Sequence, residues 1–132
     1  MGIFKKIFGI CETKPPVDNS AWSVVGNAVT LDLGRLPELA KAGGAVRLEG
    51  NGLSARIFVM KGDNGEFYVY ENRCTHMGRR LDPGERDGTV KCCSVSGSVF
   101  DLNGNPVGGA AKKPVTMFPV SLDGNQLRIS LR

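Results

Sequence analysis

Histidine and long apolar runs are scarce in this 132-residue sequence, and both shortages exclude whole classes of protein. His76 is the only histidine, so one chain cannot supply two imidazoles to a metal centre. No stretch approaches the ~20 apolar residues that a membrane-spanning helix needs. The opening MGIFKKIFGIC lacks the unbroken apolar segment and small-residue cleavage site of a secretory signal. We therefore expect a cytoplasmic protein, which can still lie peripheral to a membrane.

Cysteine is also scarce. The chain has four cysteines, Cys11, Cys74, Cys92 and Cys93, too few and too unevenly spaced for the disulfide framework of a small secreted protein. A reducing compartment would leave their thiolates available as metal ligands. Cys11 lies on the terminal segment, and we expect it to be a free thiol.

Charge of either sign is modest. Seventeen Lys and Arg against 13 Asp and Glu give a net charge of +4, and the basic residues are scattered. Aromatic residues do not alternate with basic ones, as a surface that stacks single-stranded nucleic acid would require. We expect no nucleic acid partner. The basic bias suits an acidic protein partner or an anionic membrane surface equally well.

The chain is predicted to divide into an N-terminal segment with a linker, residues 1–20, and one domain, residues 21–132. Four apolar side chains between positions 3 and 8 fall on one stripe of a short basic helix predicted over residues 3–11. Such a helix can lie on a membrane surface, dock on a partner helix, or pack on its own domain. The prolines at positions 15 and 16 prevent its continuation.

Short β-branched and aromatic runs dominate the domain, which predicts strands. The turn signals GDNG at 62–65 and DG at 123–124 join neighbouring runs as hairpins. LPELAKAGG at 36–44 predicts one or two helical turns, with proline near its start and glycine at its end. The pattern predicts an all-β fold, a small antiparallel sandwich or barrel with long loops between residues 72 and 114.

Two of these loops carry side chains that bind metals. The first contains CTHMG, with Cys74 and His76 one residue apart, and the second contains CCSVSG at 92–97. Each follows a strand-like run, so both are expected at one end of the sheet. The C-x-H pair alone is a weak signal, because an ordinary polar turn would look the same.

The stretch FYVYENRCTHMGRRLDPGERDGTVKC, followed by SGSVFDLNGNPVGG, resembles the Rieske iron–sulfur domain of ferredoxin type. That family's pattern is C-x-H, a downstream C-x-x-H-G, then x-x-F-D and a glycine turn. In the family, two cysteines hold one iron of a 2Fe–2S cluster and two histidines hold the other. The resemblance runs from about Ala45 to the C-terminus. It implies a Rieske fold, a 2Fe–2S cluster and one-electron transfer to a redox partner protein.

Carried over by position, Cys74 and His76 match the first ligand loop. In the second loop, SGSVFD sets a register in which Cys93 is the cysteine ligand and Ser96 stands in the place of the histidine. Read from the preceding strand, Cys92 takes the ligand place, with one residue inserted after it. We prefer Cys93, because C-x-x-S-G keeps the turn that brings both ligands to one side.

Four interpretations stay open. A 2Fe–2S cluster is held by Cys74, His76, Cys93 and the oxygen of Ser96, which is a poorer ligand than imidazole. Alternatively, a bulged loop turns Cys92 inward as a third thiolate. A third interpretation is a cluster-free binding or scaffold subunit of a redox complex, and a fourth is zinc held by three cysteines and a histidine. We favour the atypical 2Fe–2S centre, in an electron carrier or subunit rather than an enzyme acting alone.

Three further features surround these loops. A hydroxyl near Ser98 can hydrogen-bond toward the cluster in family members, although a turn serine bonding local backbone is an equally good explanation. Gly109 stands where the family's shielding loop often has proline. Four basic residues are candidates for a rim that steers an acidic partner: Arg79, Arg80, Lys112 and Lys113.

Overall fold

The computed structural model describes residues 11–76, 78–93 and 97–131. These residues form strands joined by turns and two short 3-10 helices. In chain order the elements are β1 (Trp22–Val25), β2 (Ala28–Asp32), η1 (Leu33–Arg35), η2 (Pro37–Leu39), β3 (Ala45–Leu48), β4 (Ile57–Lys61), β5 (Phe67–Glu71), β6 (Leu81–Pro83), β7 (Thr89–Cys92), β8 (Val99–Asp101), β9 (Pro106–Gly108), β10 (Val120–Asp123) and β11 (Gln126–Ser130). The helix expected over residues 3–11 falls almost entirely outside the described residues.

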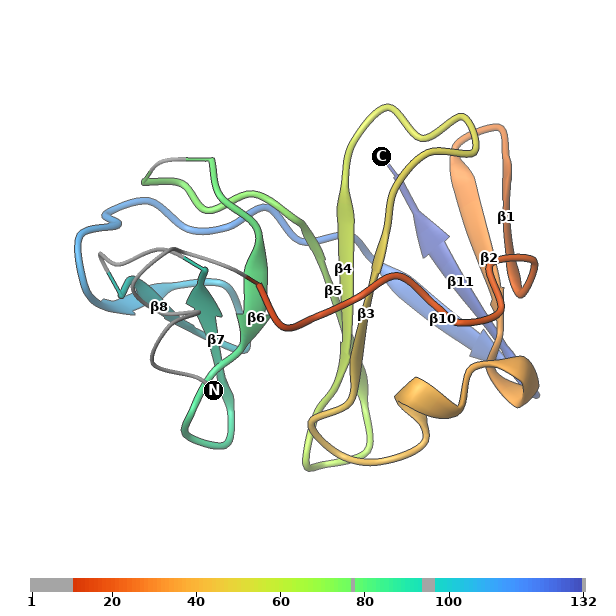
Figure 1. Ribbon diagram of the computed structural model, residues 1–132, viewed down its shortest axis with the longest axis horizontal. Coiled ribbons are helices and arrows are strands. Elements are labelled where there is room, and N and C mark those ends of the chain that lie inside the picture. The colour runs from red at the N-terminus through yellow and green to blue at the C-terminus, as the bar shows by residue number, and fades with distance from the viewer. Residues whose placement is uncertain (1–10, 77, 94–96, 132) are drawn as a thin grey trace.

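The strands form three antiparallel sheets, which confirms the predicted all-β fold. The outer sheet has the order β1-β2-β11-β10, the middle sheet β3-β4-β5, and the loop-bearing sheet β6-β7-β8-β9. Figure 1 shows the middle sheet standing between the other two. The loop-bearing sheet falls inside the stretch predicted to be long loops, so part of that stretch is strand.

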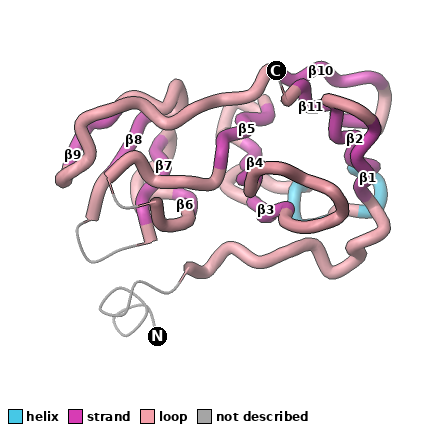
Figure 2. The backbone as a smooth tube through the Cα atoms, turned by 90° about the horizontal axis from the view of Figure 1, so that it is seen from above, coloured by secondary structure: helices cyan, strands magenta, loops and turns pink. Residues whose placement is uncertain are grey.

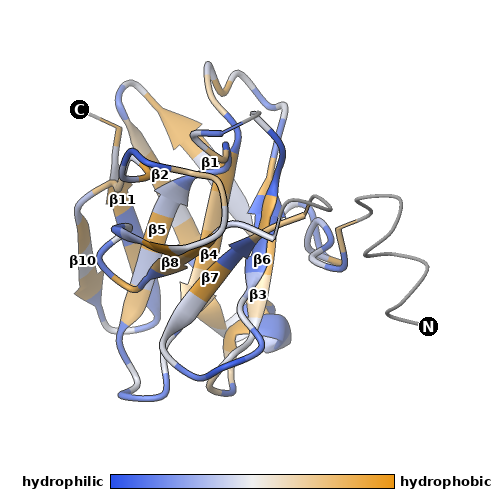
Figure 3. Ribbon diagram, turned by 90° about the vertical axis from the view of Figure 1, so that its left-hand side faces the viewer, coloured by the Kyte–Doolittle hydropathy of each residue, from blue (hydrophilic) through white to orange (hydrophobic). Residues whose placement is uncertain are grey.

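Strand β4 is the centre of the domain, and both of its faces are buried. Ile57 and Val59 pack into a first core between the outer and middle sheets. Phe58 and Met60 pack into a second core between the middle and loop-bearing sheets. Successive side chains of a strand point to opposite faces, so the apolar run IFVM fits a strand covered on both sides. Figure 3 shows apolar colouring along the strands and polar colouring in many of the connecting turns.

The second core supports the ligand-bearing loops. Its largest fully buried side chains include Phe58, Tyr70 and Phe100, and the Phe58 and Tyr70 rings lie 5.9 Å apart. The Tyr70 hydroxyl donates a hydrogen bond to the carbonyl of Leu102 over 2.7 Å. Burial raises the pKa of this hydroxyl, which keeps it protonated as a donor.

The predicted hairpins are present, and the stretch predicted to form one or two helical turns forms a single 3-10 turn. β4 and β5 pair across GDNG, and β10 and β11 pair across a two-residue turn at Gly124–Asn125, one residue later than predicted. LPELAKAGG forms the single-turn helix η2, with Pro37 in its first turn, and η1 precedes it. No helix within the described part of the chain has the length and apolarity needed to cross a membrane.

Residues 11–17, which we call the strap, run in extended form along one side of the domain from β6 past β3 (Figures 1 and 2). The Asp82 carboxylate accepts hydrogen bonds from the backbone N–H groups of Glu12 (2.9 Å) and Thr13 (2.8 Å). Two further hydrogen bonds hold the strap, from Arg47 N–H to the Lys14 carbonyl and from Val17 N–H to the Glu38 carboxylate. The strap therefore contacts the loop-bearing sheet, the middle sheet and η2.

Candidate metal centre

Loop one, residues 72–80 between β5 and β6, buries its thiol and exposes its imidazole. The Cys74 N–H donates to the Arg79 carbonyl over 2.7 Å, and the Gly78 N–H donates to the Cys74 carbonyl over 2.8 Å. These bonds close a tight turn that leaves His76 exposed. The Cys74 side chain is 1% exposed and belongs to the second core.

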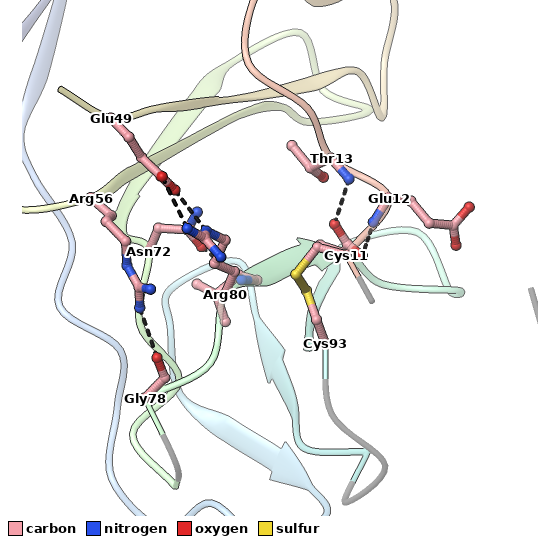
Figure 4. Close-up of a disulfide and its surroundings, with 11 residues drawn as sticks. Cys11, Glu12, Thr13, Glu49, Arg56, Asn72, Gly78, Arg80 and Cys93 are labelled. Carbon is pink, nitrogen blue, oxygen red and sulfur yellow. Dashed lines mark hydrogen bonds and ion pairs between the residues drawn. A yellow bond between two sulfur atoms is a disulfide. The ribbon is translucent and has the colours of Figure 1, made fainter. Parts of the chain in front are cut away.

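The base of loop one is fixed by Asn72, which is fully buried. Its side-chain oxygen accepts a hydrogen bond from the Leu81 backbone N–H over 2.7 Å, and its backbone N–H donates to the Arg56 carbonyl. The Arg56 guanidinium in turn donates to the Gly78 carbonyl over 2.7 Å, as Figure 4 shows. The position of Cys74 is therefore set by contacts on both sides of the loop.

Loop two, residues 93–98 between β7 and β8, is joined directly to loop one. The Cys93 N–H donates to the Arg80 carbonyl over 2.9 Å, and the Cys92 N–H donates to the Ser98 carbonyl over 2.8 Å. The two predicted ligand loops thus lie side by side at one end of the molecule. Ser96, the predicted fourth ligand, lies outside the described residues.

The adjacent cysteines Cys92 and Cys93 point to opposite sides of the loop-bearing sheet. In β7, Val90 and Cys92 belong to the second core, the same buried cluster that contains Cys74. Cys93 is buried but is not part of that cluster. Regular pairing of β6 and β7, with Leu81 opposite Cys92, turns Cys92 inward without a bulge. A bulge would be needed only for Cys92 and Cys93 to face one metal together, and that interpretation stays a prediction.

Cys93 forms a disulfide with Cys11, and the two Cα atoms lie 5.2 Å apart, within the usual range for a disulfide. The prediction of a free thiol at Cys11 is therefore wrong. The two sulfurs and a carboxylate oxygen of Asp82 all lie within 4.8 Å of one another. Figure 4 shows the bond joining the strap to the start of loop two. Among the described residues, this group is the one that places three metal-ligating side chains together, and it contains one predicted ligand, Cys93.

A third loop, between β9 and β10, packs against the first two. The Ser98 hydroxyl, fully buried, accepts a hydrogen bond from the Ala111 N–H over 3.0 Å. Thr75 in loop one donates its hydroxyl to the Lys113 carbonyl over 2.7 Å. Ser98 therefore bonds backbone thirteen residues away, and it joins loop two to the third loop.

Gly109 makes the close approach of this third loop possible. It has a φ of +78°, and a Cβ built on it would lie 2.5 Å from the Ser98 Cα. We expect Gly109→Ala to lower the free energy of unfolding by about 2–4 kcal/mol, through left-handed backbone strain and overpacking. Urea denaturation measures the loss.

Gly65→Ala is the matched control for that substitution. Gly65 has a φ of +83°, but nothing lies within 4 Å of its Cβ position. We expect a loss of only about 1 kcal/mol there, from strain alone. Equal losses in the free energy of unfolding at both positions would show that crowding against Ser98 adds nothing to the backbone strain.

Of the four basic residues predicted to form a rim around the loops, Arg80 forms an ion pair instead of facing solvent freely. Arg80 forms two hydrogen bonds with the Glu49 carboxylate, at 2.7 and 3.0 Å, and these bonds lower the pKa of that carboxyl. Arg80 is thus paired and partly buried. The other three rim residues, Arg79, Lys112 and Lys113, are exposed.

The sequence profile of the Rieske [2Fe–2S] domain family matches residues 22–119, which confirms the resemblance stated above. The 3-phenylpropionate/cinnamic acid dioxygenase ferredoxin subunits of Shigella boydii and Escherichia coli K12 are 33% identical to the chain over 69 residues. That match covers 51% of this chain and 65% of each relative.

Solved structures of similar fold include two from carbazole 1,9a-dioxygenase systems. The ferredoxin from Nocardioides aromaticivorans IC177 has a TM-score of 0.60 and 23% identity, over 73% of this chain and 91% of that one. A chain from the complex of reduced oxygenase and oxidized ferredoxin in carbazole 1,9a-dioxygenase has a TM-score of 0.58 and 22% identity, over 69% of this chain and 83% of that one. The family match implies a 2Fe–2S cluster, and the relatives to which the chain is similar are ferredoxin subunits. They do not favour the zinc or cluster-free alternatives.

Proposed function

Because the chain belongs to the Rieske [2Fe–2S] domain family, we propose that it carries single electrons as the ferredoxin component of an oxygenase system. The relatives in the comparison are ferredoxin subunits of dioxygenases, and one similar structure is a ferredoxin with its oxygenase. The observation that carries the proposal is the arrangement of two buried thiols and one exposed imidazole on adjoining loops.

The chain has the two thiolates that one iron of this family's cluster requires, but it has only one of the two imidazoles that the other iron requires. Cys74 and Cys92 lie in one buried cluster, which suits a pair of thiolates on a single iron. His76 provides one imidazole for the second iron, and Ser96 occupies the place of the other. We propose Cys92 rather than Cys93 as the second thiolate, since the Cys93 sulfur is bonded to Cys11.

A bound 2Fe–2S cluster supplies reversible one-electron chemistry. The chain's own residues set its surroundings. Burial of Cys74 and Cys92 among apolar side chains excludes water from the thiolates. The exposed His76 marks the side from which an electron can enter or leave. Exposed Arg79 on loop one, with exposed Lys112 and Lys113 on the third loop, would steer an acidic partner.

Three predictions about the whole protein complete the proposal. We propose a cytoplasmic location, where reducing conditions would keep the Cys74 thiol available as a ligand and where the Cys11–Cys93 disulfide would act as a redox-responsive bond. Residues 1–20 remain the proposed N-terminal segment and residues 21–132 the proposed domain. Contact of residues 3–11 with a membrane surface or a partner helix is a prediction about a segment outside the described residues.

Metal analysis of anaerobically purified protein tests the proposed function. We expect two irons and two acid-labile sulfides per chain, as a 2Fe–2S cluster requires, with no zinc. The visible spectrum should bleach on uptake of one electron, and the reduced form should give an electron paramagnetic resonance signal. Colourless, metal-free protein that still unfolds cooperatively would refute electron transfer. Stoichiometric zinc without sulfide would refute it equally.

A further inference from the structure

We infer that Cys11 and Cys93 form a redox-active dithiol, separate from the proposed cluster ligands, which latches the strap onto loop two. The inference rests on the geometry of the strap and applies whether or not a cluster is bound. Cys11 and the strap lie outside the segment matched to the family, which begins at residue 22, whereas Cys93 and Asp82 lie within it.

The strap brings the two cysteines together by contacts other than their own bond. Asp82, only 3% exposed, accepts the N–H groups of Glu12 and Thr13, the two residues that follow Cys11. Thr13 is itself buried against the domain. Breaking the disulfide would leave these contacts in place, so a reduced Cys11 stays beside Cys93. A partner held in position reacts at a high effective concentration.

The chemistry is thiol–disulfide exchange with a low-molecular-weight disulfide such as oxidised glutathione. Cys11, the more exposed of the two, attacks the small disulfide as a thiolate, forms a mixed disulfide and releases one small thiol. The Cys93 thiolate then attacks the Cys11 sulfur, closes the protein disulfide and releases the second small thiol. The two protons lost by the protein thiols are taken up by the two released thiolates. Excess reduced glutathione reverses both steps.

The latch has a consequence for the neighbouring metal loops. Cys93 follows Cys92 directly, and its N–H is bonded to the Arg80 carbonyl of loop one. When the disulfide is closed, the Cys93 sulfur is held on the side away from the second core, where Cys74 and Cys92 lie. The closed latch thus prevents Cys93 from competing with Cys92 for a metal. Opening it leaves the strap end held by the hydrogen bonds to Asp82 alone and frees a third thiol close to the metal loops.

Titration of the full-length protein in glutathione buffers tests the inference. Thiols are trapped by alkylation and located by mass spectrometry across a series of redox potentials. We expect Cys11 and Cys93 to change together in one two-electron transition, while Cys74 and Cys92 do not form disulfides. Pairing of Cys93 with Cys74 or Cys92, or independent titration of Cys11, would overturn the inference. Stoichiometric zinc bound through Cys11, Cys93 and Asp82 in the thiol form would also overturn it.

Amide hydrogen exchange provides a second readout on the same samples. Reduction should raise the exchange rates of the Glu12 and Thr13 amides by about tenfold, because the strap loses its covalent anchor. The Gly62 amide, bonded to Glu66 in the β4–β5 hairpin, is the control and should not change. Cys11→Ser should reproduce the reduced pattern without reductant. Unchanged strap amides would contradict the latch. Iron content is scored separately, so a colourless protein with a working latch refutes only the proposed function.

Discussion

Replacing Cys92 by alanine is expected to lower bound iron by more than about tenfold, whereas Cys93→Ser should leave iron content close to that of the unaltered protein. The reason is the alternation of side chains along β7. Cys92 enters the buried cluster that contains Cys74, while Cys93 lies on the other side and is bonded to Cys11. Loss of a thiolate from the Cys74–Cys92 pair leaves one iron without its second protein ligand.

The measurement is iron and sulfide per chain after anaerobic purification, with circular dichroism to establish that each variant is folded. Cys74→Ala is the positive control and should match Cys92→Ala. The reverse pattern, iron lost in Cys93→Ser and kept in Cys92→Ala, would restore the register read from C-x-x-S-G. It would also require the disulfide to open before the metal is bound.

Much of the fold was predictable because it depends on local signals. GDNG and DG specify hairpin turns through their glycines, and the flanking runs alternate or stay apolar as strands do. The uninterrupted apolar run IFVM in β4 also indicates a strand buried on both faces, because a strand with one face in water would alternate with polar residues. The strands β6 and β9 were missed because three residues carry too little pattern, whereas strand-like runs were expected before and after loop two.

The choice between Cys92 and Cys93 could not be made from spacing, because both fit the distance from His76 to the second loop. What decides the direction of each side chain is the pairing of β6 with β7, in which Leu81 lies opposite Cys92. That register depends on contacts between residues distant in sequence. A shift of one residue would exchange the two cysteines between the faces.

The disulfide could not be predicted for a related reason. Cys11 meets Cys93 only because the strap docks on Asp82, and the surrounding LDPG has the composition of an ordinary exposed turn. Nothing in the local sequence marks Asp82 as buried or as an acceptor for backbone N–H groups. Asn72 was missed in the same way, although it fixes the base of loop one.

Removing the disulfide is expected to have the largest effect on stability. Cys11→Ser should lower the free energy of unfolding of metal-free protein by about 3–4 kcal/mol. Cys11 and Cys93 are separated by 82 residues, and closing a loop of that length in the unfolded chain accounts for about 4.5 kcal/mol in the entropic estimate. We expect less than this value, because the measured contribution of a disulfide is typically about 2–4 kcal/mol.

Urea denaturation with and without reductant checks this prediction. Without reductant, Cys11→Ser should unfold at a lower urea concentration than the unaltered protein, and with reductant the two curves should coincide. Small domains are stable by about 5–15 kcal/mol, so the expected loss is a large fraction of the total. A thiol buffer that opens the disulfide would then lower the free energy of unfolding and also loosen the strap. A difference below about 1 kcal/mol would show that contacts such as those with Asp82 hold the strap without help from the disulfide.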